Sequence, residues 1–238
     1  LWSVHSCEKI TAGAKCHGNA FPPKSEQLVA DFVKKGATYK QWSTWGSLQM
    51  YLQIAKGLGW GTFKKFHAAA YKVAQNKGPK NSQQKHDGLC VGLSVASGKD
   101  LGKFFAAWAM PITKAGCRDI AAKYPPWLGD PMRKLLPYEA ELGTTAAASV
   151  TATAAKLGYK VVDPGGKGAK LTLHWGLSDG GTKASGWTKS KALGTPKAGT
   201  GAADASGLSS GKAHFYRLQI TNGKGTFWTP TAAKFTTK

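Results

Sequence analysis

The chain has 238 residues, of which 42% are hydrophobic and 19% are charged. This composition is typical of a folded globular protein and excludes general disorder, and the length is sufficient for two modest domains with their own cores. No apolar run approaches the roughly 20 residues that a membrane-spanning helix needs, so we expect no membrane span.

The net charge of +21 arises from 33 basic and 12 acidic residues, and only three of the basic residues are arginines, which leaves 30 lysines. Nucleic-acid readers favour clustered arginines, whose planar fork pairs with bases, so scattered lysines argue against nucleic acid as a partner. Two interpretations remain open. The lysines form a solvated surface that affects solubility, or they attract anionic glycans, sulfated or sialylated, by steering that salt weakens.

Helical periodicity dominates the first half of the chain. Ser25 precedes apolar residues at helical spacing, and Gly36 ends that pattern. Thr44 and Thr62 are expected to cap the next two helices, because a threonine hydroxyl at this position can accept a free backbone N–H. Asp100 is expected to do the same before an aromatic helix. The predicted helices cover residues 25–35, 44–58, 62–76, 85–96 and 100–108.

Aromatic side chains mark the expected core. Gly59 and Gly61 flank Trp60, so the backbone can turn sharply there while the indole points inward. Residues 101–108 carry apolar side chains on one helical face. A second aromatic group either lines a cleft or fills the end of the bundle: Tyr39, Trp42 and Trp45. The residues expected to form the structural core are Trp60, Phe63, Phe66, Phe104, Phe105, Trp108, Trp175 and Tyr216.

The helical period ends in a proline-rich connection, and the second half of the chain alternates apolar and polar residues between glycine-rich turns. Alternation at residues 146–154, 171–175 and 216–220 predicts strands of a small antiparallel β sandwich. The expected fold class is therefore multidomain α plus all-β. We expect a helical bundle subdomain in residues 1–137 and a sandwich in residues 138–238.

The four cysteines fall into two pairs. Cys90 and Cys117 lie on the inner faces of predicted helices, where free cysteines pack as small apolar side chains. Cys7, Cys16 and His17 could form part of a metal site, but the close paired spacing of a structural zinc site is missing. A free thiol pair or a surface disulfide is the alternative for Cys7 and Cys16.

Two stretches carry a family resemblance. They are LQMYLQIAKGLGWGTFKKFHAAAY, from residue 48, and SGKDLGKFFAAWAMPITKAGCRDIAAKYPPW, from residue 97. Together with the opening LWSVHSCEKI they resemble the C-terminal half of the enhancin-like zinc metallopeptidases, gluzincins that include mucin-degrading enzymes. That family holds zinc in a HExxH helix with a downstream glutamate, and this sequence contains no HExxH motif.

The resemblance implies a C-terminal fragment of a secreted bacterial metallopeptidase that acts on glycoproteins such as mucins. Zinc would belong to the full-length parent and not to this chain, which is expected to have no catalytic or metal residues and no activity alone. It also implies that Trp2 and His5 lie beside the substrate cleft, and that the protein is extracellular or at the cell surface. The alternative is a noncatalytic adhesion or binding module for anionic glycans or cell surfaces.

The second half resembles a fibronectin type III-like module. The resemblance rests on Trp175 followed by SDGGT, on Arg217 and Trp228, and on the closing FTT. His214 takes the place where such modules carry a tyrosine that ties down a corner of the sandwich. An imidazole there either makes the same bond or leaves the corner looser.

Overall fold

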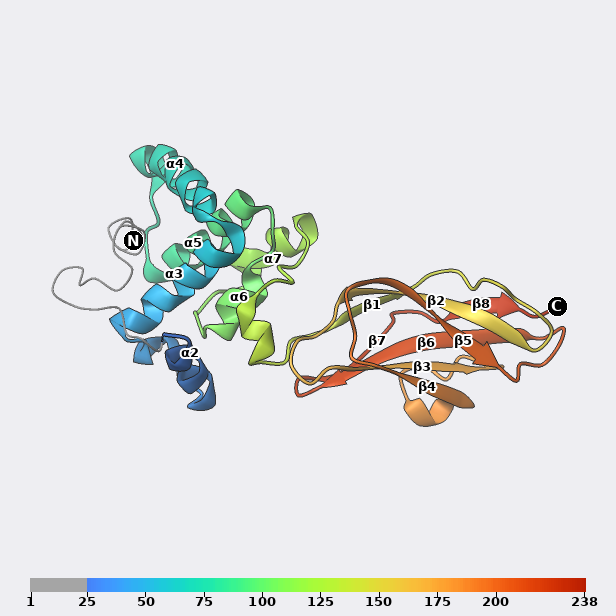
Figure 1. Cartoon of the computed structure of the whole chain (residues 1–238). Helices are drawn as coiled ribbons and strands as arrows, with labels where there is room; N and C mark the ends of the chain where they lie inside the picture. The colour runs from blue at the N-terminus through green and yellow to red at the C-terminus, as the bar shows by residue number, and fades with distance from the viewer. Residues whose placement is uncertain (1–24) are drawn as a thin grey trace. The chain divides into compact units, whose positions relative to one another are not determined.

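The computed structural model describes residues 25–238 and divides the chain into two compact units, Leu1–Met132 and Arg133–Lys238 (Figure 1). The described part of the first unit is helical, and the second unit consists of antiparallel sheets. The division falls five residues before the boundary expected from the prolines. Trp2, His5 and the group of Cys7, Cys16 and His17 lie outside the described residues.

The first unit consists of six α-helices and a short 3₁₀ segment within its described part. Helix α5 contacts α4, α6 and α7, and α3 contacts α2 and α4. The elements are α2 (Ser25–Lys34), η1 (Tyr39–Gln41), α3 (Thr44–Leu58), α4 (Trp60–Lys77), α5 (Ser82–Ser97), α6 (Gly102–Ala107) and α7 (Lys114–Lys123).

The predicted cap of α3 is wrong by one residue, and that of α4 is wrong by three. Ser43, and not Thr44, caps α3, because its side-chain oxygen accepts the N–H of Gly46 at 3.0 Å. Helix α4 begins at Trp60, because Gly59 adopts a φ of 81° and completes the turn within a single residue. Thr62 therefore lies inside α4, where its hydroxyl donates to the carbonyl of Leu58.

The later helix ends also depend on local side-chain bonds. Asn81 caps α5 by accepting the N–H of Gln84 at 2.9 Å, so this helix begins three residues before the predicted start. Its first turn is polar, and an apolar pattern gives no signal there. The Asp100 carboxylate accepts the N–H of Gly102 at 2.7 Å, although Leu101 occupies the capping position of α6. Thr113 caps α7.

The second unit is an antiparallel sandwich of two sheets. Strand β2 is central in a three-stranded sheet of order β1-β2-β5. The other sheet has the order β4-β3-β6-β7, and β8 also pairs with β6. The strands are β1 (Glu141–Thr144), β2 (Ala154–Asp163), β3 (Lys170–Gly176), β4 (Lys189–Gly194), β5 (Gly199–Ser206), β6 (Ala213–Asn222), β7 (Gly225–Trp228) and β8 (Ala233–Thr236).

Alternation predicted β3 and β6 correctly, but the strand predicted at residues 146–154 is wrong. Before Ala154, only Ala148 in that stretch forms a bridge, with Lys156, and Ser149 has a positive φ of 49°. Thr151 then closes a turn, because its hydroxyl oxygen accepts the N–H of Ala154 at 2.9 Å. The strand β2 begins only at Ala154.

The sandwich core lies between the two sheets. Leu157 and Val161 of β2 pack with Leu173 of β3 and Leu218 of β6, and all four are at most 1% exposed. Burial of this apolar surface is the main stabilising contribution, at about 25 cal/mol per Å².

Two lysines protect the edge of the larger sheet. Lys189 and Lys191 of β4 pair with Trp175 and Leu173, which places them on the core side of the sheet. The Nζ atom of Lys189 donates to the carbonyls of Ser206 and Gly207, and that of Lys191 donates to the carbonyl of Asp204. Both lysines are exposed, and charged side chains on an edge strand are a common way to keep it from pairing with other chains.

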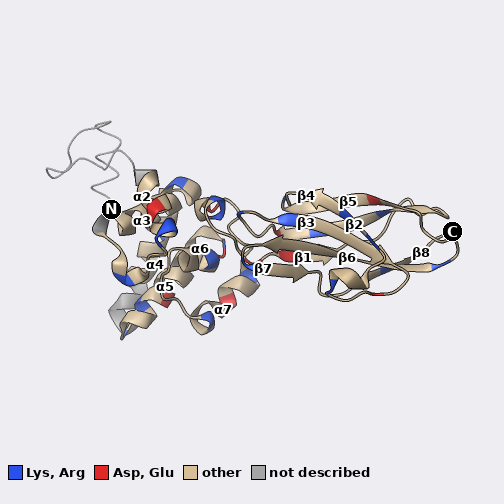
Figure 2. Cartoon of the chain, turned by 90° about the horizontal axis from the view of Figure 1, so that it is seen from below, with Lys and Arg blue, Asp and Glu red and all other residues tan. Residues whose placement is uncertain are grey.

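The remaining charged residues are widely distributed. Figure 2 shows lysine and arginine positions on the helices of the first unit and on the strands of the second, with no single element collecting them. Within residues 25–238, none of the helices combines the length and the apolar character needed to cross a membrane.

Candidate functional site

The residues expected to form the core differ in burial. Phe104, Phe105, Trp108 and Tyr216 are at most 1% exposed, and Phe63 and Trp175 are also buried. Trp60 and Phe66 are only partly buried. Trp60 packs against Phe63, with ring centroids 5.7 Å apart. The substrate-adjacent candidates Trp2 and His5 lie outside the described residues.

The aromatic group near η1 packs against the helical core. Trp42 meets Trp108 edge to face at 5.8 Å, and Phe32 lies 5.3 Å from the same indole. The Tyr39 hydroxyl lies 2.9 Å from Nε2 of His86. Tyr39 and Trp42 are half-buried and pack against the helical core, which favours the core interpretation over the cleft.

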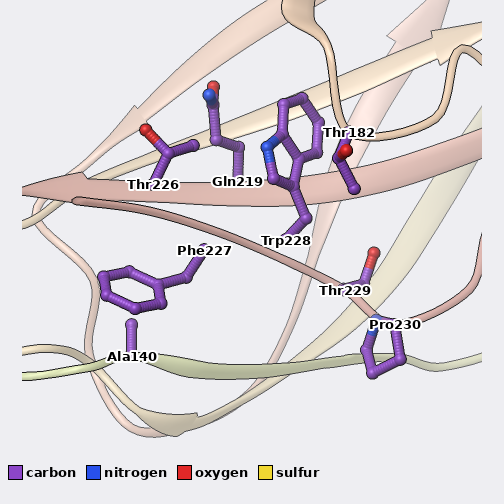
Figure 3. A pocket seen from close by; sticks show the side chains of 8 residues that line it. All are labelled: Ala140, Thr182, Gln219, Thr226, Phe227, Trp228, Thr229 and Pro230. Atoms are coloured by element: carbon purple, nitrogen blue, oxygen red, sulfur yellow. The ribbon is translucent and has the colours of Figure 1, made fainter.

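A hollow on the described surface lies beside β7 in the sandwich and has a volume of about 680 Å³. Figure 3 shows Gln219, Trp228 and Thr226 on one side of β7, with Phe227 and Ala140 on the other. All of the lining side chains are uncharged. They are Ala140, Thr182, Gln219, Thr226, Phe227, Trp228, Thr229 and Pro230.

His174 supports the aromatic side of this hollow. It is 4% exposed, and its ring lies 4.9 Å from Trp228 and 6.5 Å from Trp187. Nε2 lies 3.0 Å from Oε1 of Gln219, so we infer that Nε2 carries the proton and donates to this oxygen. Burial lowers the pKa of His174, against the opposing effect of this hydrogen bond, so the imidazole is neutral at pH 7.

An ion pair fixes the loop that contributes Thr182. Arg217 donates to both carboxylate oxygens of Asp179, at 3.0 and 2.7 Å. The hydrogen bonds from Arg217 hold the pKa of Asp179 below its usual value. Arg217 also donates to the carbonyls of Thr229 and Pro230, so one guanidinium holds two walls of the hollow.

The hollow is suited to binding and not to acid–base chemistry. An indole face, an amide and three threonine hydroxyls can stack on and hydrogen-bond to an uncharged polar ligand. No lining residue titrates near neutral pH. The sequence reasoning missed this site, because it depends on the pairing of Gln219 with Trp228 across β6 and β7, and spacing along the chain does not reveal that register.

Residues 25–238 contain no group of three or more histidine, cysteine, aspartate or glutamate side chains that could hold a metal ion. A catalytic zinc site needs three protein ligands that converge on one point. The described residues therefore do not fit the zinc implied by the sequence resemblance, and no zinc chemistry is derived from them.

Comparison with known proteins gives a family match. Residues 4–109 match the model of the family described as Peptidase M60, enhancin and enhancin-like. TRPM8 channel-associated factor 2 of Homo sapiens is 31% identical over 138 residues, which cover 57% of this chain and 15% of that protein. TRPM8 channel-associated factor 3 of Rattus norvegicus is 30% identical over 135 residues, which cover 56% of this chain and 14% of that protein.

A solved structure, the ZmpB metallopeptidase from Clostridium perfringens, aligns with a TM-score of 0.29 and 17% identity. The alignment covers 79% of this chain and 35% of that one. This TM-score is too low to establish a shared fold. The chain spans only 14–15% of the length of the curated relatives named above. The family match therefore shows similarity to the M60 peptidases over residues 4–109.

Proposed function

We propose that this chain is part of a zinc metallopeptidase of the enhancin-like type that acts on glycoproteins such as mucins. The observation that carries the proposal is the match of residues 4–109 to the Peptidase M60 family. The helical unit would form part of the peptidase domain, and its rigid aromatic core would support the substrate cleft without contributing a catalytic group. Trp2 and His5 would lie beside that cleft.

In this proposal zinc is held by residues outside the 238 of this chain, because the sequence contains no HExxH motif. The parent protein would be secreted or displayed at the cell surface, where glycoproteins are accessible. The test begins with the coding sequence upstream of Leu1, which should encode HExxH and a later glutamate. The longer protein should then cleave a mucin-type glycoprotein, and glutamine in place of the HExxH glutamate should abolish cleavage.

We further propose that the sandwich is an accessory module of the fibronectin type III-like kind. Its strand order and the buried Trp175 on β3 support this assignment. His214 supports it as well, because its Nε2 lies 3.3 Å from both the backbone nitrogen and the carbonyl oxygen of Ser209. The imidazole would thus make the corner bond that a tyrosine makes in such modules.

A second candidate function is noncatalytic binding at an anionic cell surface. The curated relatives favour it, because they are named as channel-associated factors and not as peptidases. The lysine-rich composition would supply the attraction to anionic glycans. An upstream sequence without HExxH, together with salt-sensitive binding of this chain to heparin or a sialylated mucin, would favour this candidate over the peptidase.

A further inference from the structure

The two cysteines of the helical unit that the structure describes face each other across two helices. Cys90 on α5 and Cys117 on α7 are free thiols, and their Sγ atoms are 3.5 Å apart. A disulfide requires about 2.05 Å, so the sulfur atoms need to approach by only about 1.5 Å. Small side-chain rotations can supply a movement of this size.

A second contact between the same helices holds them in this register. The Asp87 carboxylate accepts the backbone N–H and the hydroxyl of Thr113, both at 2.8 Å. Asp87 lies one turn before Cys90 on α5, and Thr113 lies one turn before Cys117 at the start of α7. The thiol pair is therefore fixed by the polar contact one turn away.

Glycine allows the helices to come this close. A Cβ atom added at Gly116 would lie 2.5 Å from the Asp87 carboxyl group, which is closer than real Cβ contacts allow. Cys117, the next residue, thereby approaches α5 closely enough for its sulfur to contact that of Cys90.

We propose that Cys90 and Cys117 form a disulfide that joins α5 to α7 under oxidising conditions, and that Cys117 is the thiol that reacts first. This inference is independent of the proposed peptidase function. Cys90 is fully buried, whereas Cys117 is partly exposed, so only Cys117 is accessible to a soluble oxidant. The oxidant belongs to the class of small-molecule disulfides, for which glutathione disulfide serves as the probe.

The exchange proceeds in two balanced steps. The Cys117 thiolate attacks one sulfur of glutathione disulfide, so that a mixed disulfide forms, the glutathione S–S bond breaks, and one glutathione leaves and takes up a proton. Cys90 then loses its proton and attacks Sγ of Cys117, which releases the second glutathione. Two protein thiols are oxidised, and one glutathione disulfide is reduced to two thiols.

The electrostatic environment agrees with this order. Burial raises the pKa of Cys90 strongly, and the nearby Cys117 adds to the effect. Burial also raises the pKa of Cys117, but the hydrogen bond with Cys90 opposes that shift. Cys117 is thus the better nucleophile of the two.

The test uses the full chain with Cys7 and Cys16 replaced by serine, incubated with glutathione disulfide and analysed by intact mass and nonreducing peptide mapping. We expect a product two hydrogen atoms lighter than the starting chain, with Cys90 linked to Cys117. The melting temperature of the helical unit should rise by about 10 °C and return after reduction, since the bond closes a loop of intermediate length. A product that stops at the mixed disulfide, or no reaction, would overturn the proposal.

Two single variants in the same background test the order of attack. In Cys90→Ser the reaction should stop with one glutathione on Cys117, because the resolving thiol is missing. In Cys117→Ser the buried Cys90 should remain unmodified in the folded chain. Equal rates of glutathione addition to the two variants, both shown by circular dichroism to be folded, would contradict the assignment of Cys117 as the first nucleophile.

Discussion

Arg133 and Asp163 form a buried, two-pronged ion pair at the start of the sandwich unit. The two guanidinium nitrogens lie 2.6 and 2.9 Å from the carboxylate oxygens, and the side chains are 8% and 0% exposed. The Asp163 carboxylate also accepts the backbone N–H of Gly165. Arg133 lies over the Tyr138 ring at 4.6 Å. One pair thus anchors the first residue of the unit to the end of β2.

Removing one partner of this pair should be strongly destabilising. Arg133→Met leaves the Asp163 carboxylate buried without its countercharge, and we expect a loss of about 3–5 kcal/mol in the free energy of unfolding of the sandwich. The matched control is Asp179→Asn, which breaks the more exposed pair with Arg217, whose guanidinium keeps its bonds to two backbone carbonyls, and should cost only about 1 kcal/mol. Urea denaturation of the full chain measures both, and equal losses would contradict the contrast.

Deletion of Trp108 should destabilise the helical unit more than deletion of Trp60. Trp108 is fully buried and its Nε1 donates to Gln53 at 2.9 Å, so Trp108→Ala should cost about 3–5 kcal/mol. Trp60 is only partly buried, and Trp60→Ala should cost about half as much. Urea midpoints for the two variants provide the measurement. Unchanged midpoints in both would mean that neither ring belongs to the core.

Two glycines offer opposite outcomes for the same substitution. Gly116→Ala places a methyl group against the Asp87 carboxyl, which its bonds to Thr113 hold in place, and should cost about 1–3 kcal/mol. It should also slow closure of the disulfide between Cys90 and Cys117. Gly88→Ala meets no atom within 4 Å and should stabilise helix α5 by about 0.5–1 kcal/mol. Thermal melts that shift in the same direction would refute the packing argument.

His174 should make the sandwich less stable at mildly acidic pH. Its pKa in the folded state is lowered from the ordinary value of 6.5, so the unfolded chain binds the proton more readily. The stabilising contribution of the neutral ring is present above pH 6.5 and is lost as the pH falls from there toward the folded-state pKa. His174→Asn should weaken this dependence, as measured by urea melts at about pH 7.5 and about pH 5. An identical pH dependence in both proteins would exclude His174 as its source.

The sequence predicted the fold more completely than it predicted the contacts. Alternation of apolar and polar residues was sufficient to predict β3 and β6, because every second side chain in these strands faces the core. The predicted start of α4 was too late, because Gly59 alone makes the turn between α3 and α4 at a positive φ. The helix therefore begins before Thr62, the residue that was expected to cap it. The first turn of α5 was missed, because a polar turn carries no apolar signal.

The hollow beside β7 and the thiol pair were harder to predict, because both depend on contacts between residues that are far apart in the sequence. Residues that line the hollow, such as Gln219 and Trp228, become neighbours only through strand register, and Cys90 meets Cys117 only through helix packing. The spacing of apolar residues places both cysteines on the inner faces of their helices, but it does not show that the two side chains are in contact. The expectation that they pack as small apolar side chains therefore did not include the contact between their sulfur atoms.

The bonds of Lys189 and Lys191 to the carbonyls near the end of β5 limit how the positive charge of the sandwich can be used. An anion that recruits either ammonium group must first break bonds that hold the edge of one sheet to the other. Counterion release on binding a polyanion should therefore be smaller than the lysine count suggests. Acetylation of these two amines, by contrast, would remove the positive charges from the edge strand β4 and so lower the barrier to its pairing with a strand of another chain.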